Sequence, residues 1–208
     1  MQEGLAALNE RVRRDLEMVA HPALDWMPQR RTPGGEPLLD VLIVGAGQGG
    51  LALAFRLLTE RVHNIRVVDS APRGREGVWR TYARMPTLRS PKDYTGPDLG
   101  VPSLTYRAWH EARFGATDFA ALHLIPTNYW ADYLDWFRDV LELPVDNEHR
   151  LVDVEPCETH LVAHLETANG RRAVPTRKLV LASGQTGTGR WTIPPIIENL
   201  PTGRYAHC

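Results

Sequence analysis

Three glycines and one carboxylate carry the chemistry that the sequence suggests most strongly. Gly45, Gly47 and Gly50 follow the apolar run Val41–Val44 with the spacing Gly-x-Gly-x-x-Gly. The first glycine permits a tight turn, the second lets the backbone approach a pyrophosphate, and the third lets a following helix pack close to the strand. Asp69 ends a second apolar run, where a carboxylate can accept hydrogen bonds from both hydroxyls of a ribose. This pattern predicts a dinucleotide-binding site.

The surrounding segment supplies the elements that must position these residues. An apolar strand enters the glycine loop (residues 45–50), a helix is predicted over Leu51–Leu58, and a second strand ends at Asp69. The N–H groups and the dipole at the start of that helix favour a bound phosphate, and Gln48 and Gly49 complete the predicted cradle. A carboxylate at the ribose repels a 2′-phosphate, so we expect FAD or NAD rather than NADP at this site.

Composition excludes several other classes of function. The chain has 208 residues, 43% of them hydrophobic, and a formal net charge of −1, so no global field points to a nucleic acid or to an acidic membrane. No apolar run is long enough to cross a bilayer. Cys157 and Cys208 are far apart in the sequence and form no disulfide framework, which favours a reduced, cytoplasmic protein.

The chain divides into two predicted parts. Residues 1–38 form an amphipathic helix and a proline-rich linker, and residues 39–208 form the nucleotide-binding domain. Within the second part, Ser70–Pro102 is a long loop without clear periodicity, which is unusual in a compact domain and often functional. A short helix over Leu104–Phe114 and an apolar connector over Phe119–Ile125 are expected to follow.

A strong helix is predicted to begin with Thr127 as its N-cap and to end before Pro144. Its apolar residues fall on one stripe, which is the ordinary pattern of a helix packed on a core. The stripe contains Trp130, Tyr133, Leu134, Phe137, Val140 and Leu141.

The last third of the chain alternates as strands do. The alternating segments are Leu151–Val154, His160–Thr167 and Arg171–Val174, and a separate apolar strand is expected over Lys178–Ala182. Asn169-Gly170 predicts a tight hairpin turn between two of them. On such a strand His160 and His164 share a wet face without further ligands at metal spacing, so no metal site is expected.

Several short motifs, taken with this order of elements, resemble the FAD-binding half of flavoproteins that have two dinucleotide domains. Gly77-Val78-Trp79 resembles a Gly-Gly-x-Trp element, although Glu76 replaces its first glycine. Leu88–Lys92 resembles a Leu-Arg-Thr-x-x-Pro-Lys loop, and Leu179–Gly184 is similar to a strand ending in Ala-Thr-Gly. These motifs are most similar to the flavin-containing monooxygenase group, which includes Baeyer–Villiger and N-hydroxylating enzymes.

The end of the chain extends the likeness only in part. Gly203–Cys208 is similar to the start of that group's Phe-x-Gly-x-x-x-His-Ser/Thr fingerprint. Thr202 replaces the aromatic residue, and Cys208 replaces the final hydroxyl residue. The two departures weaken the monooxygenase assignment without affecting the predicted FAD site.

The resemblance implies a fold, a cofactor and a reaction. The fold is α/β, a Rossmann-type parallel sheet with a β-meander and a helical and loop insertion. In the group, NAD(P)H reduces FAD and a peroxyflavin transfers oxygen to a small-molecule substrate. Trp79 and Arg89 would lie near the isoalloxazine, Ser183 and Gly184 would return the chain close to FAD, and no catalytic residue can be assigned.

Members of the group carry a second glycine motif for NADPH after the fingerprint, and this chain ends at Cys208 before it. The segment Gly184–Gly189 has the wrong glycine order, and the prolines after it prevent a regular helix. We therefore expect NADPH to bind only if a missing C-terminal domain or a partner chain supplies its site.

Two other functions remain open from the sequence. A simple NAD-dependent dehydrogenase could use the single glycine loop, although the long loop over 70–102 and the meander argue against it. A non-catalytic module that binds a nucleotide or a protein partner would show bound nucleotide without reduction by any nicotinamide.

Overall fold

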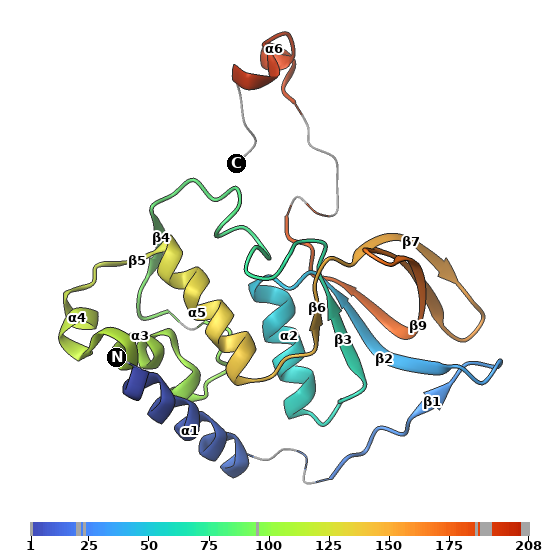
Figure 1. Cartoon of the computed structure of the whole chain (residues 1–208), viewed down its shortest axis with the longest axis horizontal. Helices are drawn as coiled ribbons and strands as arrows, with labels where there is room; N and C mark the ends of the chain where they lie inside the picture. The colour runs from blue at the N-terminus through green and yellow to red at the C-terminus, as the bar shows by residue number, and fades with distance from the viewer. Residues whose placement is uncertain are drawn as a thin grey trace.

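The computed structural model describes residues 2–19, 22, 24–94, 96–185, 187 and 193–204. A seven-stranded sheet with the order β6-β3-β2-β9-β8-β7 runs through the molecule, and the short β1 pairs with the start of β2 (Figure 1). Its strands are β1 (Arg30–Arg31), β2 (Pro37–Val44), β3 (Ile65–Val68), β6 (Val145–Asp146), β7 (Arg150–Pro156), β8 (Leu161–Thr167) and β9 (Gly170–Leu181).

The two halves of the sheet have different topology. Strands β6, β3, β2 and β9 are parallel to one another, whereas β9, β8 and β7 form an antiparallel meander. The parallel half is rich in β-branched and other apolar residues because both of its faces are covered. The structure therefore confirms the predicted Rossmann-type sheet with a meander.

Strand β9 corrects one expectation. Arg171–Val174 and Lys178–Ala182 were predicted as separate strands, but residues 170–181 form one strand of 12 residues. Pro175 separates the two segments in the sequence, and a proline argues against a central strand. Pairing of β9 with β2 begins only at Thr176, so the missing N–H of Pro175 costs no bond to β2. The hairpin turn is confirmed, with Gly170 at a φ of 101°.

Each face of the parallel strands packs on a different layer. Helix α2 (Gln48–Thr59) covers one face, where Leu51 and Phe55 meet Ile43 and Val67 in one buried cluster. The meander curls over the other face and forms a second cluster. The fully buried members of that cluster are Leu42, Val68, Ala163 and Leu165.

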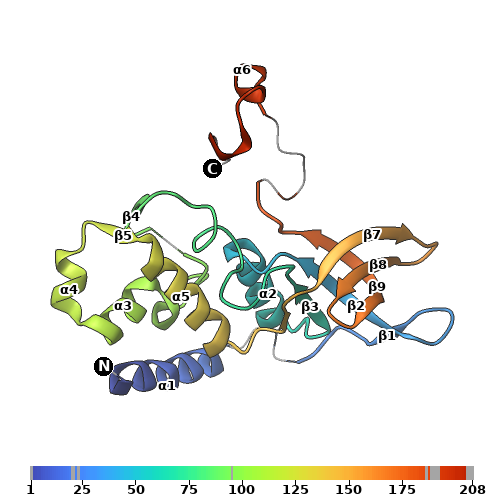
Figure 2. The same ribbon diagram turned by 45° about the horizontal axis from the view of Figure 1, so that its top comes forward.

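The chain between β3 and β6 forms a largely helical insertion beside α2 (Figures 1 and 2). The insertion contains β4 (Thr87–Pro91), a 3-10 turn at Pro102–Leu104, α3 (Tyr106–Phe114), α4 (Ala116–Ala121), β5 (Leu124–Pro126) and α5 (Thr127–Val140). Strands β4 and β5 pair with each other in a separate two-stranded sheet. The predicted apolar connector at 119–125 is thus the end of a helix followed by a short strand.

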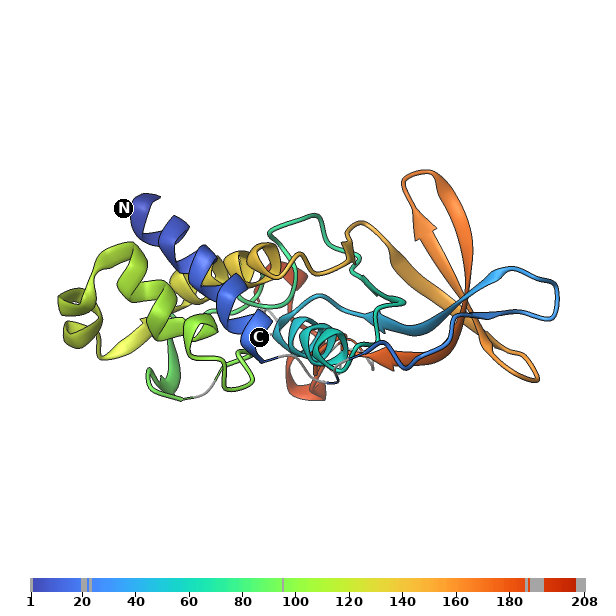
Figure 3. The ribbon, with the colours of Figure 1, turned by 90° about the horizontal axis from the view of Figure 1, so that it is seen from below.

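Helix α1 (Gln2–Met18) lies across the insertion at the end of the molecule opposite the meander (Figure 3). It contacts α3 closely, since a Cβ on Gly4 would lie 2.2 Å from the carbonyl oxygen of Ala112. Leu8 and Val12 are buried in the main core. The predicted amphipathic helix is confirmed, and its apolar face is part of the core. At the other end of the chain, α6 (Pro195–Glu198) and a 3-10 turn at Thr202–Arg204 follow β9.

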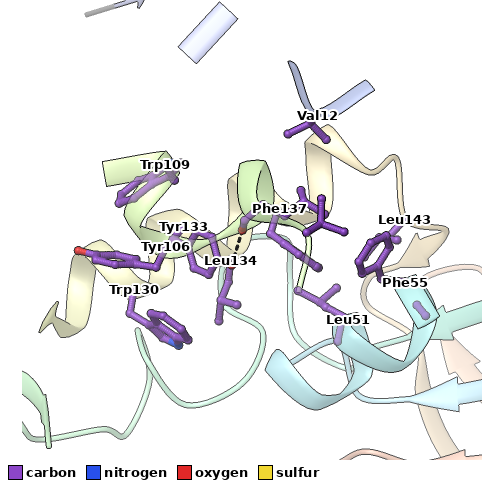
Figure 4. Close-up of a cluster of buried hydrophobic side chains, with 14 of the residues drawn as sticks. Val12, Leu51, Phe55, Tyr106, Trp109, Trp130, Tyr133, Leu134, Phe137 and Leu143 are labelled. Atoms are coloured by element: carbon purple, nitrogen blue, oxygen red, sulfur yellow. Dashed lines mark hydrogen bonds between the residues drawn. The ribbon is translucent and has the colours of Figure 1, made fainter. Parts of the chain in front are cut away.

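Helix α5 confirms the predicted stripe but not the predicted cap. Thr127 is the first helical residue, and its hydroxyl donates to the carbonyl oxygen of Met85 rather than capping the helix. Pro126 occupies the N-cap position because the preceding strand β5 fixes an extended backbone there. The buried aromatic residues of the stripe pack with those of α3 (Figure 4). No helix in the described part of the chain is long and apolar enough to cross a membrane.

Candidate functional site

Two glycines of the loop are required by the fold itself. Gly45 has a φ of 109°, and a Cβ there would lie 2.5 Å from the carbonyl oxygen of Ala182. A Cβ on Gly50 would lie 1.9 Å from the carbonyl oxygen of Gly45. These contacts are with backbone atoms, which cannot move aside cheaply. The turn between β2 and α2 therefore closes only without side chains at these positions.

The other two glycines are not required by the protein's own packing. A Cβ on Gly47 would meet the Cα of Gly77 at 3.5 Å, an ordinary contact, and a Cβ on Gly49 would meet nothing within 4 Å. Gly47 is also the N-cap of α2, and it makes no side-chain cap hydrogen bond. The start of α2 thus has free space and backbone N–H donors, as a pyrophosphate requires. These residues fit the dinucleotide that the sequence predicts.

Asp69 holds the glycine loop in place. Its carboxylate accepts one hydrogen bond from the backbone N–H of Ala46 at 2.7 Å and another from that of Ala71 at 2.8 Å. The side chain is largely buried at the end of β3. The sequence suggested only a contact with a ribose, and these bonds to the protein were missed. The ribose contact itself stays a prediction.

Trp79 lies on the irregular segment between β3 and β4, called here the Trp79 loop (residues 70–86). Together with the glycine loop and α5 it lines a narrow pocket of about 20 Å³, which is room for a single water molecule. The pocket is lined by Ala46, Gly47, Leu51, Glu76, Trp79, Arg80, Ala131, Leu134, Asp135 and Arg138. The structure thus brings the predicted Trp79 and the glycine loop together.

Trp130 joins this site to the aromatic core. It is buried on α5, as the predicted stripe requires, and its ring meets that of Trp79 edge-on with 6.5 Å between centroids. Its indole N–H also donates to the side-chain oxygen of Gln48 at 3.2 Å. A residue interpreted as core from the sequence therefore also orients a residue of the glycine loop.

Glu76 explains the departure from the glycine that the motif would have. Its carboxylate accepts from Arg138 of α5 and from the side-chain amide of Asn147, both at 2.6 Å. The side chains of Glu76 and Arg138 are only 8% and 14% exposed. These contacts hold the Trp79 loop against α5 and against the residue that follows β6.

Arg80 makes a second connection to α5. Its guanidinium donates to Asp132 at 2.6 Å and to Asp135 at 2.5 Å, and also to the carbonyl oxygen of Gly74. Burial raises the pKa of the Asp135 carboxyl above its ordinary value, and the Arg80 guanidinium opposes that shift. These partners of Arg80 were not predicted from the sequence. The spacing of Asp132, Asp135 and Asp139, which places them on one helix face, could have indicated them.

Other predicted site residues differ in how near they lie to the glycine loop. Ser183 is the second residue after the end of β9, and its backbone nitrogen would be 3.0 Å from a Cβ on Gly45. Its hydroxyl is buried without a hydrogen-bond partner among the described residues. Gly184 is exposed with a φ of 78°. Arg89 is exposed on β4, and within the described ranges no hydrogen bond or ion pair joins it to the glycine loop.

Some sequence predictions fall outside the described residues. Residues 205–208 of the terminal fingerprint are among them, as are residues 186, 188 and 189 of the rejected second glycine loop. In the rest of the chain, no group of three or more His, Cys, Asp or Glu side chains is arranged to hold a metal ion.

Sequence comparison identifies related proteins. A family model described as FAD-NAD(P)-binding matches residues 42–186. The chain is 48% identical over 205 residues to the FAD-dependent urate hydroxylase of Xanthomonas campestris. That match covers 98% of this chain and 43% of the relative, so the chain spans less than half the length of the curated protein it matches.

Solved structures share the fold. The ornithine hydroxylase of Pseudomonas aeruginosa matches 77% of this chain with a TM-score of 0.63 and 19% identity, over 42% of its own length. The flavin-containing monooxygenase of Stenotrophomonas maltophilia matches 70% of this chain with a TM-score of 0.54 and 20% identity, over 38% of its own length. Since the family model covers more than half of the sequence, the chain belongs to the FAD-NAD(P)-binding family, with the fold of the FAD part of flavin monooxygenases.

Proposed function

We propose that this chain is the FAD-binding part of an FAD-dependent monooxygenase, and that the substrate class is urate or a similar oxidised purine. The observation that carries the FAD site is the start of α2, where no side chain caps the helix, a Cβ on Gly49 would meet nothing within 4 Å, and Gly47 faces the backbone of Gly77 at an ordinary contact distance. The identity to a urate hydroxylase over nearly the whole chain supports the reaction and the substrate class. The sites for NAD(P)H and substrate would lie in a region equivalent to the part of that relative outside the match.

The chain's own residues have defined tasks in this proposal. Backbone N–H groups at the start of α2, from Gly47 onward, would hold the pyrophosphate, and Asp69 would keep the loop closed while it faces the ribose. Trp79 would form one wall of the site and Ser183 another. FAD, when bound, would accept a hydride from NAD(P)H and, once reduced, react with oxygen. Excluding water and orienting the cofactor is the protein's contribution.

Titration of the purified chain with FAD, followed by flavin fluorescence and visible absorption, tests this proposal. We expect one FAD per chain. Gly47→Val should weaken FAD binding by at least about tenfold, because the backbone at this position must approach the pyrophosphate closely and a branched side chain keeps the two apart. The new Cβ itself would meet the Cα of Gly77 at 3.5 Å, an ordinary contact.

Gly34→Ala is the matched control, since Gly34 lies in the segment before β2 and a Cβ there would meet only the hydroxyl of Thr32 at 3.7 Å. It should leave FAD affinity unchanged. Binding of NAD without FAD would instead establish the dehydrogenase alternative. Binding of neither nucleotide would overturn the proposal.

A further inference from the structure

The Trp79 loop contains no helix or strand, yet three of its charged residues, Arg73, Glu76 and Arg80, form ion pairs with a single helix. Between residues 69 and 86 the backbone is irregular. A loop of this length without internal structure is held by few backbone hydrogen bonds, so its shape depends on side-chain contacts. In this loop the ion pairs go to α5, which also carries Trp130, and Asn147 adds hydrogen bonds to Glu76 and to the carbonyl oxygen of Ala71.

The pairs on the two sides of Trp79 are the most buried ones. Glu76 precedes Trp79 by three residues and pairs with Arg138 at 8% and 14% side-chain exposure. Arg80 follows Trp79 directly and pairs with Asp132 at 31% and 30% exposure. Both Glu76 and Arg80 line the same pocket as Trp79 and Gly47.

A third pair joins the same loop to the same helix but lies in solvent. Arg73 donates to Asp139 at 2.6 Å, with side-chain exposures of 66% and 51%. Exposed pairs contribute little because water screens them and the long side chains lose entropy, whereas a pair shielded from water is costly to break. The loop therefore has strong connections beside Trp79 and a weak one at Arg73.

Helix α5 connects these pairs to the nucleotide side of the pocket. Trp130 contacts the ring of Trp79 and donates to Gln48, the first residue of α2. The same rigid helix thus contacts both loops. A change in the way the Trp79 loop sits on α5 would move Trp79 relative to Gly47.

We propose that Glu76 and Arg80 are positioning residues, which hold the Trp79 loop on α5 and thereby set the shape of the FAD site. This inference rests on the proposed function for its ligand, but the position of Trp79 can be measured without FAD. Neither side chain needs to touch the cofactor for this role.

The test compares Glu76→Ala with Arg73→Ala, which removes the exposed pair from the same loop. We expect Glu76→Ala to weaken FAD binding by about tenfold or more and to make Trp79 more accessible to acrylamide in the FAD-free chain. The fluorescence of Trp79 is isolated by subtracting a Trp79→Phe background. Arg73→Ala should stay within about twofold of the wild type in FAD affinity.

Two further variants distinguish a positioning role of Glu76 from a general effect on the stability of the chain. Leu165→Ala removes a buried side chain of the meander that does not line the pocket of Trp79 and Gly47, and it should lower the melting temperature without changing FAD affinity or Trp79 quenching. Glu76→Gln keeps an oxygen for both donors and should restore part of the affinity. If Glu76→Ala does not fold, Arg80→Gln is measured against the same controls.

The outcomes are distinct. Unchanged FAD affinity and unchanged Trp79 quenching in a folded Glu76→Ala or Arg80→Gln chain would overturn the inference. So would an equal loss of affinity in Leu165→Ala. If the wild type binds no FAD, the proposed function fails, and Trp79 quenching alone decides whether the pairs position the loop.

Discussion

The glycine loop and the Trp79 loop form two sides of one pocket, but different forces hold them. The glycine loop is fixed by backbone atoms that meet without side chains between them, as Gly45 and Gly50 do. The Trp79 loop is fixed by ion pairs to a helix far along the chain, such as Glu76 with Arg138, 62 residues away. The first arrangement can be inferred from local spacing, whereas the second arises only when the chain is folded.

The largest effect should come from placing a side chain inside the glycine loop. Gly50→Ala places a Cβ 1.9 Å from the carbonyl oxygen of Gly45, so α2 must move away from β2. We expect a loss of unfolding free energy on the order of 4 kcal/mol, measured by urea denaturation. Gly49→Ala meets nothing within 4 Å and should be neutral or slightly stabilising. Equal losses in the two variants would show that these contacts do not hold the turn.

A smaller effect should separate the buried and exposed pairs of the Trp79 loop. In a double-mutant cycle, Glu76 and Arg138 should show a coupling energy of roughly 2 kcal/mol, because both are shielded from water. The cycle for Arg73 and Asp139 should give less than about 0.5 kcal/mol. The comparison between the loops would fail if both cycles gave the same value, since burial would then not decide the strength of the pair.

Asp69 connects the two loops, because it accepts from Ala46 in one and from Ala71 in the other. Asp69→Asn keeps one oxygen acceptor but turns an N–H group toward a backbone donor. We expect a loss of about 1.5 kcal/mol in unfolding free energy. Asp146→Asn on the neighbouring strand β6 is the control, since that side chain makes no hydrogen bond within the described ranges. A loss of equal size in the control would assign the effect to charge rather than to the loop bonds.

Local rules predicted much of the fold. The order of strand, glycine turn, helix, strand and carboxylate lies within about thirty residues, and each part follows from spacing and backbone sterics. The same holds for the stripe of α5, because helical periodicity depends on neighbours along the chain. The parallel sheet and the meander, which follow from these elements, were predicted correctly.

The errors lie where distant contacts decide the local structure. Thr127 could cap a helix, but a carbonyl oxygen from residue 85 takes its hydroxyl. Pro175 would end an isolated strand, but pairing with β8 on one side carries the strand through it. Glu76 was interpreted as a departure from a glycine motif, and its partners on α5 and directly after β6 could not be located from the sequence. Such side-chain pairs require the tertiary structure.

His110 of α3 belongs to the same aromatic core as Trp130, and the ring of Tyr106 contacts both residues. The His110 ring is fully buried among aromatic residues, and its nitrogens have no hydrogen-bond partner among the described residues. Asp118 lies 3.4 Å from Nε2 without hydrogen-bond geometry. No periodicity in the sequence distinguished this histidine from the apolar residues around it.

The smallest predicted effect concerns the pH dependence of this core. Burial lowers the pKa of His110 below its ordinary value of 6.5, and the nearby Asp118 and Glu111 oppose that shift while Lys92 adds to it. The unfolded chain therefore takes up a proton at this residue before the folded chain does. Its stability contribution is full above pH 6.5 and is lost as the pH falls toward the folded pKa. Urea denaturation between pH 7.5 and 5.5 should show a loss that His110→Leu reduces. Identical pH slopes in the wild type and the variant would show that this histidine is not held neutral by the fold.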